Sequence, residues 1–187
     1  SALLEAAKQA GTPIVEVAAG DTILDAADCL LSAVGPDPVR PVPPERENDA
    51  SVVALARFPR GRALLTGDIE RAAELVLLTR SEGVRAEVLK VPHHGSGTST
   101  TRELLGAVAP AIAVVSVGRG NRFGHPDDSV LARLRDAGAT VFRTDEDGAV
   151  VVCFGRRIVA RAVLSRRAAT SQGQSGSDGK RGPAAAR

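Results

Sequence analysis

The sequence predicts an α/β fold in which helices pack against a sheet. Short apolar runs alternate with helix-like segments between residues 62 and 143, and this alternation is typical of strands joined by crossover helices. The chain has 187 residues, of which 43% are hydrophobic, so it can bury one sizeable core. We therefore predict a single domain, or most of one, over residues 1–165.

The N-terminal third is predicted to hold one helix and several strands. The helix covers residues 2–8 and ends before Gly11 and Pro13. Strands are predicted at 14–17, 29–34, 51–58 and 62–65. The last two flank Pro-Arg-Gly at 59–61, which is typical of a hairpin turn. The proline-rich, charged segment 35–48 predicts a surface loop or spacer.

Helices and strands then alternate to the end of the predicted domain. Helices are predicted from Ile69 onward, at 98–109 and at 127–138. Thr100 and Glu103 have the spacing of a capping box at the start of the second helix. Strands are predicted at 111–117, 140–143, 149–154 and 157–164. We expect 140–143 to pair with 149–154 across a turn at 145–148, with 157–164 as an edge strand.

Charge is unevenly distributed along the chain. Residues 155–187 hold eight Lys or Arg and one acidic residue, although the whole chain carries a formal charge of only +2. The Ser, Gly, Gln, Ala and Arg content of 166–187 predicts a disordered basic tail. Such a tail can attract DNA or an anionic membrane, and solubility alone is the simpler interpretation.

Composition argues against several kinds of site. No apolar run approaches the roughly 20 residues of a membrane-spanning helix, and the sequence does not begin with a signal peptide. Aromatic residues make up 2% of the chain, so we expect nucleic-acid contacts through phosphates rather than base stacking. We expect no hydrophobic pocket for a small-molecule cofactor. Cys29 and Cys153 lie in apolar runs and predict buried thiols, with a disulfide left open.

Metal-competent side chains follow two of the predicted strands. Asp68 comes just after the strand at 62–65, and His94 lies 26 residues further on, about one strand–helix–strand unit. Both are therefore expected at one edge of the sheet. The alternative for Asp68 is an N-cap of the next helix. Adjacent His93 and His94 point in different directions, so at most one is expected to bind a metal ion. A pair of loop histidines without function is the alternative.

A Ser/Thr-rich loop at 95–101 precedes a predicted helix. Hydroxyl groups and free N–H groups in such a loop suit a phosphate, which indicates Ser96, Thr98 and Ser99 as phosphate-binding residues. An ordinary capped loop is the alternative.

A second polar loop, 118–126, carries His125, Asn121 and Arg122. Arg122 could neutralise phosphate charge, and Asn121 lies beside it as a further substrate contact. The alternatives are a surface charge for Arg122 and a helix-entry residue for His125.

Five short motifs stand in a characteristic order along the chain. They are Asn-Asp-Ala-Ser at 48–51, Leu-Leu-Thr-Gly-Asp at 64–68, Lys-Val-Pro-His-His-Gly-Ser at 90–96, Ser-Val-Gly-Arg-Gly-Asn-Arg-Phe-Gly-His-Pro at 116–126 and Arg-Thr-Asp-Glu-Asp-Gly at 143–148. Together they resemble the C-terminal metallo-β-lactamase-like domain of ComEC, the DNA-uptake channel family of natural competence. The resemblance covers roughly residues 1–155 and implies the C-terminal half to two-thirds of a four-layer αββα sandwich.

The resemblance also implies chemistry, namely hydrolysis of a phosphodiester with two divalent ions, Zn or Mn. Asp68 matches the position where an aspartate bridges the two ions, and His94 matches the position of a metal ligand. His125 matches a histidine at the rim of the active site, and His93 is placed beside it as a second catalytic residue. The implied substrate is incoming single-stranded DNA. The implied partner is the membrane channel of the same protein, in the plasma membrane, with this domain on the extracytoplasmic side.

The chain departs from this family in one respect. The family carries its main metal cluster on a His-x-His-x-Asp-His segment near the start of the domain, and this chain, with three histidines, has no such segment. We therefore expect the chain, which starts at Ser1, to be the C-terminal part of a larger protein and to be inactive alone, because too few ligands are present for two ions. A non-catalytic scaffold or DNA-binding domain, and a metallo-hydrolase of another phosphodiester, are the alternatives.

Overall fold

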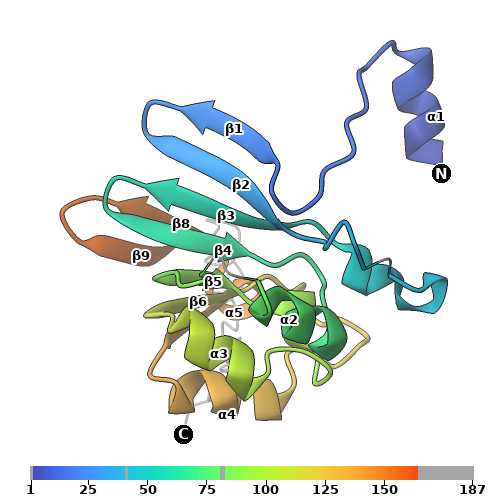
Figure 1. Ribbon diagram of the computed structural model, residues 1–187. Coiled ribbons are helices and arrows are strands. Elements are labelled where there is room, and N and C mark those ends of the chain that lie inside the picture. The colour runs from blue at the N-terminus through green and yellow to red at the C-terminus, as the bar shows by residue number, and fades with distance from the viewer. Residues whose placement is uncertain (1, 41, 81–82, 164–187) are drawn as a thin grey trace, which may run out of the picture.

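The computed structural model describes residues 2–40, 42–80 and 83–163. Seven strands lie in chain order in one sheet (Figure 1). They are β1 (Thr22–Ala26), β2 (Cys29–Gly35), β3 (Val53–Phe58), β4 (Gly61–Leu65), β5 (Val88–Lys90), β6 (Ile112–Val115) and β7 (Thr140–Arg143). Two more strands, β8 (Ala149–Phe154) and β9 (Ile158–Val163), form a separate sheet. Helices α2 (Arg71–Leu78), α3 (Arg102–Val108) and α4 (Asp128–Asp136) join the later strands of the large sheet.

The large sheet changes from antiparallel to parallel pairing at β4. Strands β1 to β4 pair in antiparallel fashion, and β3 and β4 meet in the predicted hairpin, where Phe58 pairs with Gly61. Strands β4 to β7 run parallel, because each connection between them passes through one of the three helices. The carboxyl ends of these parallel strands therefore share one edge of the sheet, where ligand sites commonly form.

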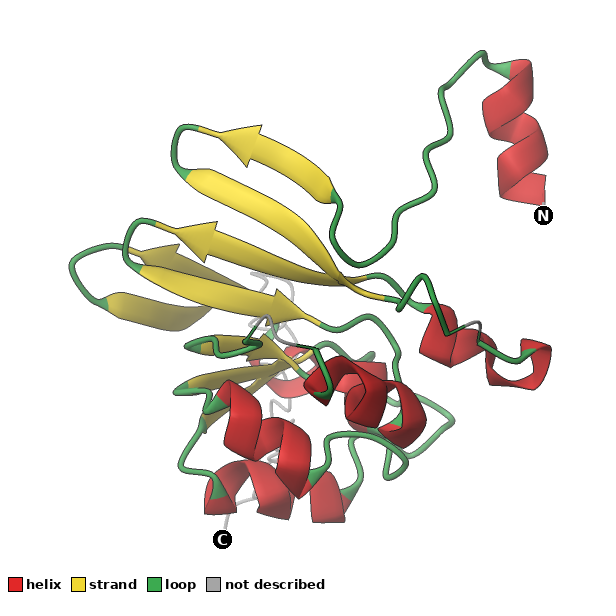
Figure 2. Cartoon of the chain, viewed as in Figure 1, coloured by secondary structure: helices red, strands yellow, loops and turns green. Residues whose placement is uncertain are grey.

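Helices cover one face of the large sheet, and the β8–β9 hairpin covers the other (Figure 2). On the helix side, Leu64 of β4 packs in the same cluster as Leu104 of α3 and Leu134 of α4. On the other side, Ala63 of β4 belongs to a cluster with Ile158 of β9. Successive residues of a strand face opposite sides, so neighbouring residues of β4 serve two cores. The predicted α/β class is confirmed.

The contact between the two sheets depends on a close approach. The rings of Phe58 and Phe154 stack with their centroids 4.2 Å apart. A Cβ at Gly61 would lie 2.5 Å from Cδ1 of Ile158. Glycine at the tip of the β3–β4 hairpin thus allows the second sheet to pack closely.

In the N-terminal third, one predicted strand does not form and one strand was not predicted. Residues 14–17 form no strand, and Val15 is 77% exposed, because that segment has no neighbouring strand to pair with. The first strand is instead β1, which pairs with β2 through a hairpin in which Ala26 lies opposite Cys29. The proline-rich segment ends in a short 3-10 helix, η1 (Pro44–Ala50).

Two predictions near the later helices were also wrong. Strand β7 pairs in parallel with β6 rather than with β8, because the short helix α5 (Thr144–Asp147) separates β7 from β8, which joins β9 in the second sheet. The N-cap of α3 is Thr101, whose side chain accepts a hydrogen bond from the Leu104 amide, so the expected capping box of Thr100 and Glu103 does not form.

The N-terminal helix α1 (Ala2–Gln9) projects away from the sheet on an extended segment (Figure 1). Within the described ranges, no helix is long and apolar enough to cross a membrane. Both cysteines are free thiols, and neither is fully buried as predicted: Cys29 is half-buried, and Cys153 is exposed because it lies on the outer face of β8. The predicted basic tail, 166–187, lies outside the described residues.

Candidate functional site

The parallel strands bring the predicted site residues to one edge of the sheet. Asp68 follows β4, His93 and His94 follow β5, and His125 lies in the loop after β6. The His93 ring lies 6.3 Å from the His94 ring and 5.7 Å from the His125 ring, measured between centroids. All three histidines of the chain therefore gather in one place.

Asp68 sits in a tight turn rather than at the start of a helix. Gly67 has a φ of +56°, and Ser51 Oγ accepts a hydrogen bond from the Asp68 amide at 3.1 Å. Helix α2 begins only at Arg71, with Glu70 in the N-cap position. The N-cap alternative for Asp68 is therefore wrong.

The two adjacent histidines occupy an unusual backbone conformation. Both lie in η2 (Pro92–Gly95), with φ values of 46° for His93 and 54° for His94. Left-handed φ is uncommon for residues other than glycine, and runs of such residues concentrate at functional sites. The His93 amide donates a hydrogen bond to the Gly67 carbonyl at 3.3 Å, which ties the histidine turn to the Asp68 turn.

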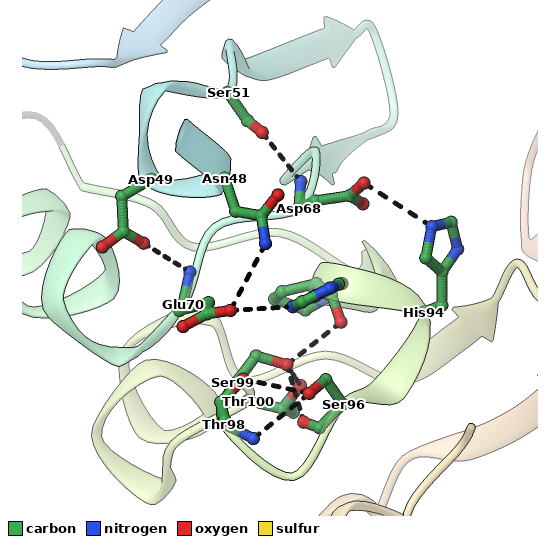
Figure 3. A network of polar contacts seen from close by, with 12 residues as sticks. Asn48, Asp49, Ser51, Asp68, Glu70, His94, Ser96, Thr98, Ser99 and Thr100 are labelled. Atoms are coloured by element: carbon green, nitrogen blue, oxygen red, sulfur yellow. Dashed lines mark hydrogen bonds and ion pairs between the residues drawn. The ribbon is translucent and has the colours of Figure 1, made fainter. Parts of the chain in front are cut away.

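His94 faces Asp68 across a short gap (Figure 3). Its Nδ1 lies 2.6 Å from the Ser116 carbonyl oxygen; a carbonyl only accepts, so Nδ1 must carry the proton and donate. In the neutral ring this leaves Nε2 with a free lone pair, 3.5 Å from Oδ2 of Asp68. A backbone carbonyl that holds one ring nitrogen is the usual support for a metal-binding histidine.

His93 turns away from His94 toward a second carboxylate. Its Nδ1 lies 3.2 Å from Oε1 of Glu70, yet it is buried and lacks a hydrogen bond of good geometry among the described residues. The two histidines thus point in different directions, as predicted, and each lies beside one carboxylate.

Glu70 is held by residues at the end of the proline-rich segment and just after it. The Glu70 amide donates to Oδ1 of buried Asp49 at 2.7 Å, and the Asn48 side-chain amide donates to Oε1 of Glu70 at 3.4 Å (Figure 3). Together with Ser51, these residues use the Asn-Asp-Ala-Ser motif at 48–51 to brace the turn that carries Asp68 and Glu70.

Lys90 occupies the last position of β5 and reaches into the same turn. Its Nζ donates to the Gly67 carbonyl at 2.6 Å and lies 3.5 Å from Oδ1 of Asp68. Burial lowers the pKa of Lys90, and the charge of Asp68 opposes that shift. The Asp68 carboxylate therefore has a cation beside one oxygen and an imidazole nitrogen beside the other.

The Ser/Thr-rich loop is held mainly by its own hydrogen bonds. Ser99 is buried, and its hydroxyl donates to the carbonyls of Pro92 and Ser96. The hydroxyls of Ser96 and Thr98 lie 3.0 Å apart (Figure 3), and Thr98 is exposed. The prediction that these residues contact phosphate stays a prediction.

Two charged residues clamp this loop from the helices. Glu74 of α2 is fully buried and accepts hydrogen bonds from the amides of Thr100 and Thr101. Arg133 of α4 donates to the carbonyls of Thr100 at 2.8 Å and Ser99 at 3.0 Å. The amides ahead of α3 that a phosphate was expected to use are thus already bound to Glu74.

His125 is positioned by Asn121. The Asn121 side chain donates to the His125 carbonyl at 2.7 Å and accepts from the His125 amide at 3.0 Å. Burial lowers the pKa of His125, with further lowering from the charges of His93 and His94, while Asp127 opposes the shift. Asn121 therefore acts within its own loop in this conformation, and its contact with substrate stays a prediction.

Next to His125 lies the exposed end of the loop. The Phe123 ring stacks on the His125 ring, with centroids 6.0 Å apart and planes at 18°. The Arg122 guanidinium carbon lies 5.1 Å from the Phe123 centroid. A cavity of about 420 Å³ is lined by residues of this loop and its neighbours: His94, Ser116, Val117, Gly118, Asn121, Phe123, His125 and Thr144.

Asp68 and His94 have the spacing of two ligands of one metal ion. Two ligands that each lie about 2.1 Å from a tetrahedral ion are separated by about 3.4 Å, close to the 3.5 Å between Asp68 Oδ2 and His94 Nε2. Within the described ranges, no group of three or more His, Cys, Asp or Glu residues could hold a metal ion. Asp68 and His94 therefore suit a metal ion but do not complete its coordination.

Sequence reasoning missed several residues of this site. Glu70 and Lys90 carry no spacing signal of their own, and Glu74 resembles any polar residue on a helix. Asn48 and Asp49 stood inside a noted motif but had no assigned role. Their importance comes from contacts between segments far apart in the chain.

Comparison with known proteins places this arrangement in context. The chain is 34% identical over 158 residues to ComE operon protein 3 of Bacillus subtilis, a match that covers 83% of this chain and 20% of that protein. It is 38% identical over 119 residues to Competence protein ComA of Neisseria gonorrhoeae (61% and 17% covered). It is 40% identical over 108 residues to Recombination protein 2 of Haemophilus influenzae (58% and 14% covered).

Other comparisons add little. No family model matches the chain. A solved structure from Parabacteroides distasonis, provisionally named a metal-dependent hydrolase, has a TM-score of 0.44 and 18% identity, covering 75% of this chain and 61% of that one. That likeness is too distant to bear on the function.

The chain spans about a fifth or less of the length of the three curated relatives. Two of the three relatives carry names of the Com series, ComE operon protein 3 and Competence protein ComA. The five sequence motifs and these relatives indicate the same family. This chain is a ComEC-like domain, similar over most of its own length to one part of ComE operon protein 3.

Proposed function

We propose that this domain is part of a metal-dependent phosphodiesterase of the ComEC type that hydrolyses incoming DNA with two divalent ions, Zn or Mn. One observation carries the proposal. Asp68, His94 and His125 converge at the carboxyl ends of the parallel strands, with the free Nε2 of His94 3.5 Å from the Asp68 carboxylate, in a chain similar to competence proteins.

In this proposal Asp68 and His94 hold the metal ions. Bound divalent ions would lower the pKa of a water molecule and offset the charge of a phosphate. Lys90 beside Asp68 Oδ1 fixes the orientation of that carboxylate. We propose that further ligands come from a part of the protein outside these 187 residues, and we therefore expect this chain alone to be inactive.

His125 and His93 would handle protons and hydrogen bonds at the phosphate. The lowered pKa of His125 favours a neutral imidazole near pH 7, which can donate a hydrogen bond from its ring N–H to a phosphate oxygen. His93 with Glu70 forms an imidazole–carboxylate pair that can hold a proton nearby.

Ser96, Thr98 and Arg122 are proposed as contacts to neighbouring phosphates, with Ser99 and Asn121 as further candidates whose side chains here hold their loops. Arg122 carries its charge beside the cavity at the site. An arginine suits this role because its guanidinium can make two parallel hydrogen bonds to phosphate.

The likeness to competence proteins also suggests the setting. We propose that the protein acts on single-stranded DNA at a channel formed by another part of the same protein in the plasma membrane. This domain would lie on the extracytoplasmic side, and its reaction needs no small-molecule cofactor.

The test is metal content and DNA cleavage by the protein at its full natural length. Asp68→Asn keeps the side-chain size but removes the charge that holds the ions, so both metal content and cleavage should fall by more than about tenfold. Asp25→Asn, on the exposed strand β1, is the control and should leave both unchanged.

A second candidate is a non-catalytic domain that scaffolds the channel or binds DNA. It is favoured by the finding that Asp68 and His94 stand without a third ligand among the described residues. A folded protein with no bound metal and no cleavage would support this candidate. If the protein cleaves other phosphodiesters but not DNA, it is a metal-dependent hydrolase whose substrate is a different phosphodiester.

A further inference from the structure

One side chain near the site is unusually exposed for its type. Phe123 is 69% exposed, whereas Phe58, Phe142 and Phe154 pack against the cluster between the two sheets. Exposure of a large aromatic ring costs hydrophobic free energy that burial would recover, so a ring that stays exposed beside a functional site suits contact with a ligand.

The residues around Phe123 indicate which kind of ligand its ring could contact. The ring stacks on His125, with centroids 6.0 Å apart, and lines the same 420 Å³ cavity as His94. It is therefore close to the Asp68–His94 pair, with the positive Arg122 side chain 5.1 Å from its centroid. These three groups suit the parts of one nucleotide. The flat ring suits the base, the adjacent cation suits a phosphate, and the nearby Asp68–His94 pair suits the point of cleavage.

We propose that Phe123 is a stacking platform for one base of a nucleic-acid strand whose phosphate lies at the Asp68–His94 pair. This inference rests on the proposed function and adds how the strand is placed. The scarcity of aromatic residues suggested contacts through phosphates alone, but a single ring at the site is enough to hold a single base. Stacking on an aromatic ring accepts any base, so Phe123 would set the position of the strand without reading its sequence.

The test compares two short labelled single strands of equal length in the presence of a chelator, so that binding is measured without cleavage. One strand carries bases, and the other has the same deoxyribose-phosphate backbone with no bases. Stacking of one base is worth about 1–3 kcal/mol, or roughly 5- to 150-fold in affinity. The protein at its full natural length should therefore bind the strand with bases at least about fivefold more tightly.

Phe123→Ala should remove most of this difference while keeping the affinity for the base-free strand, and Phe123→Trp should keep the difference. Leu24→Ala, on exposed strand β1, is the control for loss of an exposed apolar side chain. If Phe123→Ala weakens binding of both strands equally, or of neither, the stacking role is wrong while the phosphodiesterase proposal stands. If the natural protein binds neither strand under these conditions, the stacking role is wrong, whereas the phosphodiesterase proposal is decided by the separate measurement of metal content and DNA cleavage.

Discussion

Single residues decide the geometry of the turns that hold Asp68, His93 and His94. Gly67 has a φ of +56°, a region open to glycine and costly for other residues. The two histidines adopt similar angles without that freedom, so the surrounding structure must hold them there. The hydrogen bonds from the His93 amide and from Lys90 Nζ, both to the Gly67 carbonyl, are part of that support.

Gly67→Ala should destabilise the protein for two reasons. The positive φ is unfavourable for alanine, and the new Cβ would lie 2.5 Å from Cβ of Ser51. We expect a loss of about 2 kcal/mol or more in the free energy of unfolding, measured by urea denaturation.

Gly106→Ala is the matched control because it makes the same chemical change in the exposed interior of α3, where a Cβ meets nothing within 4 Å. Alanine is the better helix former, so this variant should gain about 0.5–1 kcal/mol. Equal effects of the two substitutions would contradict the role assigned to Gly67.

The pKa of His125 should lie below the ordinary value for histidine of about 6.5. Burial and the neighbouring His93 and His94 disfavour its charged form, against the opposing Asp127. His93→Gln removes one of these charges and should raise the pKa of His125, whereas Asp127→Asn should lower it further. Both shifts can be followed by NMR titration of the ring protons.

The sign for stability follows from the same shift. Below about pH 6.5 the unfolded chain binds this proton more readily than the folded protein. The contribution of His125 to stability is thus complete above that pH and is lost as the pH falls. A His125 pKa at or above the ordinary value would contradict this account.

At the scale of elements, α2 and α4 hold the loop that follows the histidine turn. Glu74 binds two amides of that loop, and Arg133 binds two of its carbonyls. The negative Glu74 thus binds backbone N–H groups of the loop, and the positive Arg133 binds its backbone carbonyl groups. Because the loop is continuous with His93 and His94, this clamp also restrains the site.

Glu74→Gln should weaken this clamp. The buried amide offers one acceptor in place of two, so one backbone N–H loses its partner at a cost of about 1–3 kcal/mol. Thermal or urea unfolding measures the loss. Glu103→Gln, at an exposed position of α3, should change stability by less than about 0.5 kcal/mol. Similar unfolding midpoints for both variants would show that the Glu74 contacts contribute little.

At the scale of the whole molecule, two apolar layers lie on opposite faces of one sheet. Large aliphatic residues fill the helix side. Smaller residues of the central strands and the stacked rings of Phe58 and Phe154 fill the side of the second sheet. The β8–β9 hairpin depends on this second layer, since a two-stranded sheet alone is marginally stable in water.

A double-mutant cycle of Phe58→Ala and Phe154→Ala should show coupling of about 0.5–1.5 kcal/mol, as expected for a stacked aromatic pair. The control cycle pairs Phe58→Ala with Leu134→Ala, on the opposite face of the sheet, and should be additive. Unfolding free energies of the single and double variants provide the measurement. Additivity in both cycles would mean that the two rings stack without mutual stabilisation.

Much of this architecture follows from local pattern. The alternation of apolar runs and helical segments predicts the order of β4 to β7 and their helices, because period and length are properties of short segments. The same reasoning fails at residues 14–17, where an apolar alternation has no partner strand. It also fails at β7 and β8, where a local turn signal suggested pairing within one sheet although the chain passes to another.

For the site too, some residues could be predicted from the sequence and others could not. Asp68, His94 and His125 stand out in the sequence because chemically competent side chains follow strands, and their convergence follows from parallel pairing. Glu70, Lys90, Glu74 and Phe123 acquire their roles only through contacts or exposure in three dimensions. Local sequence thus determines which elements form and which side chains end them, because those depend on neighbouring residues. Packing between distant segments decides which carboxylate meets which imidazole and which aromatic ring stays exposed.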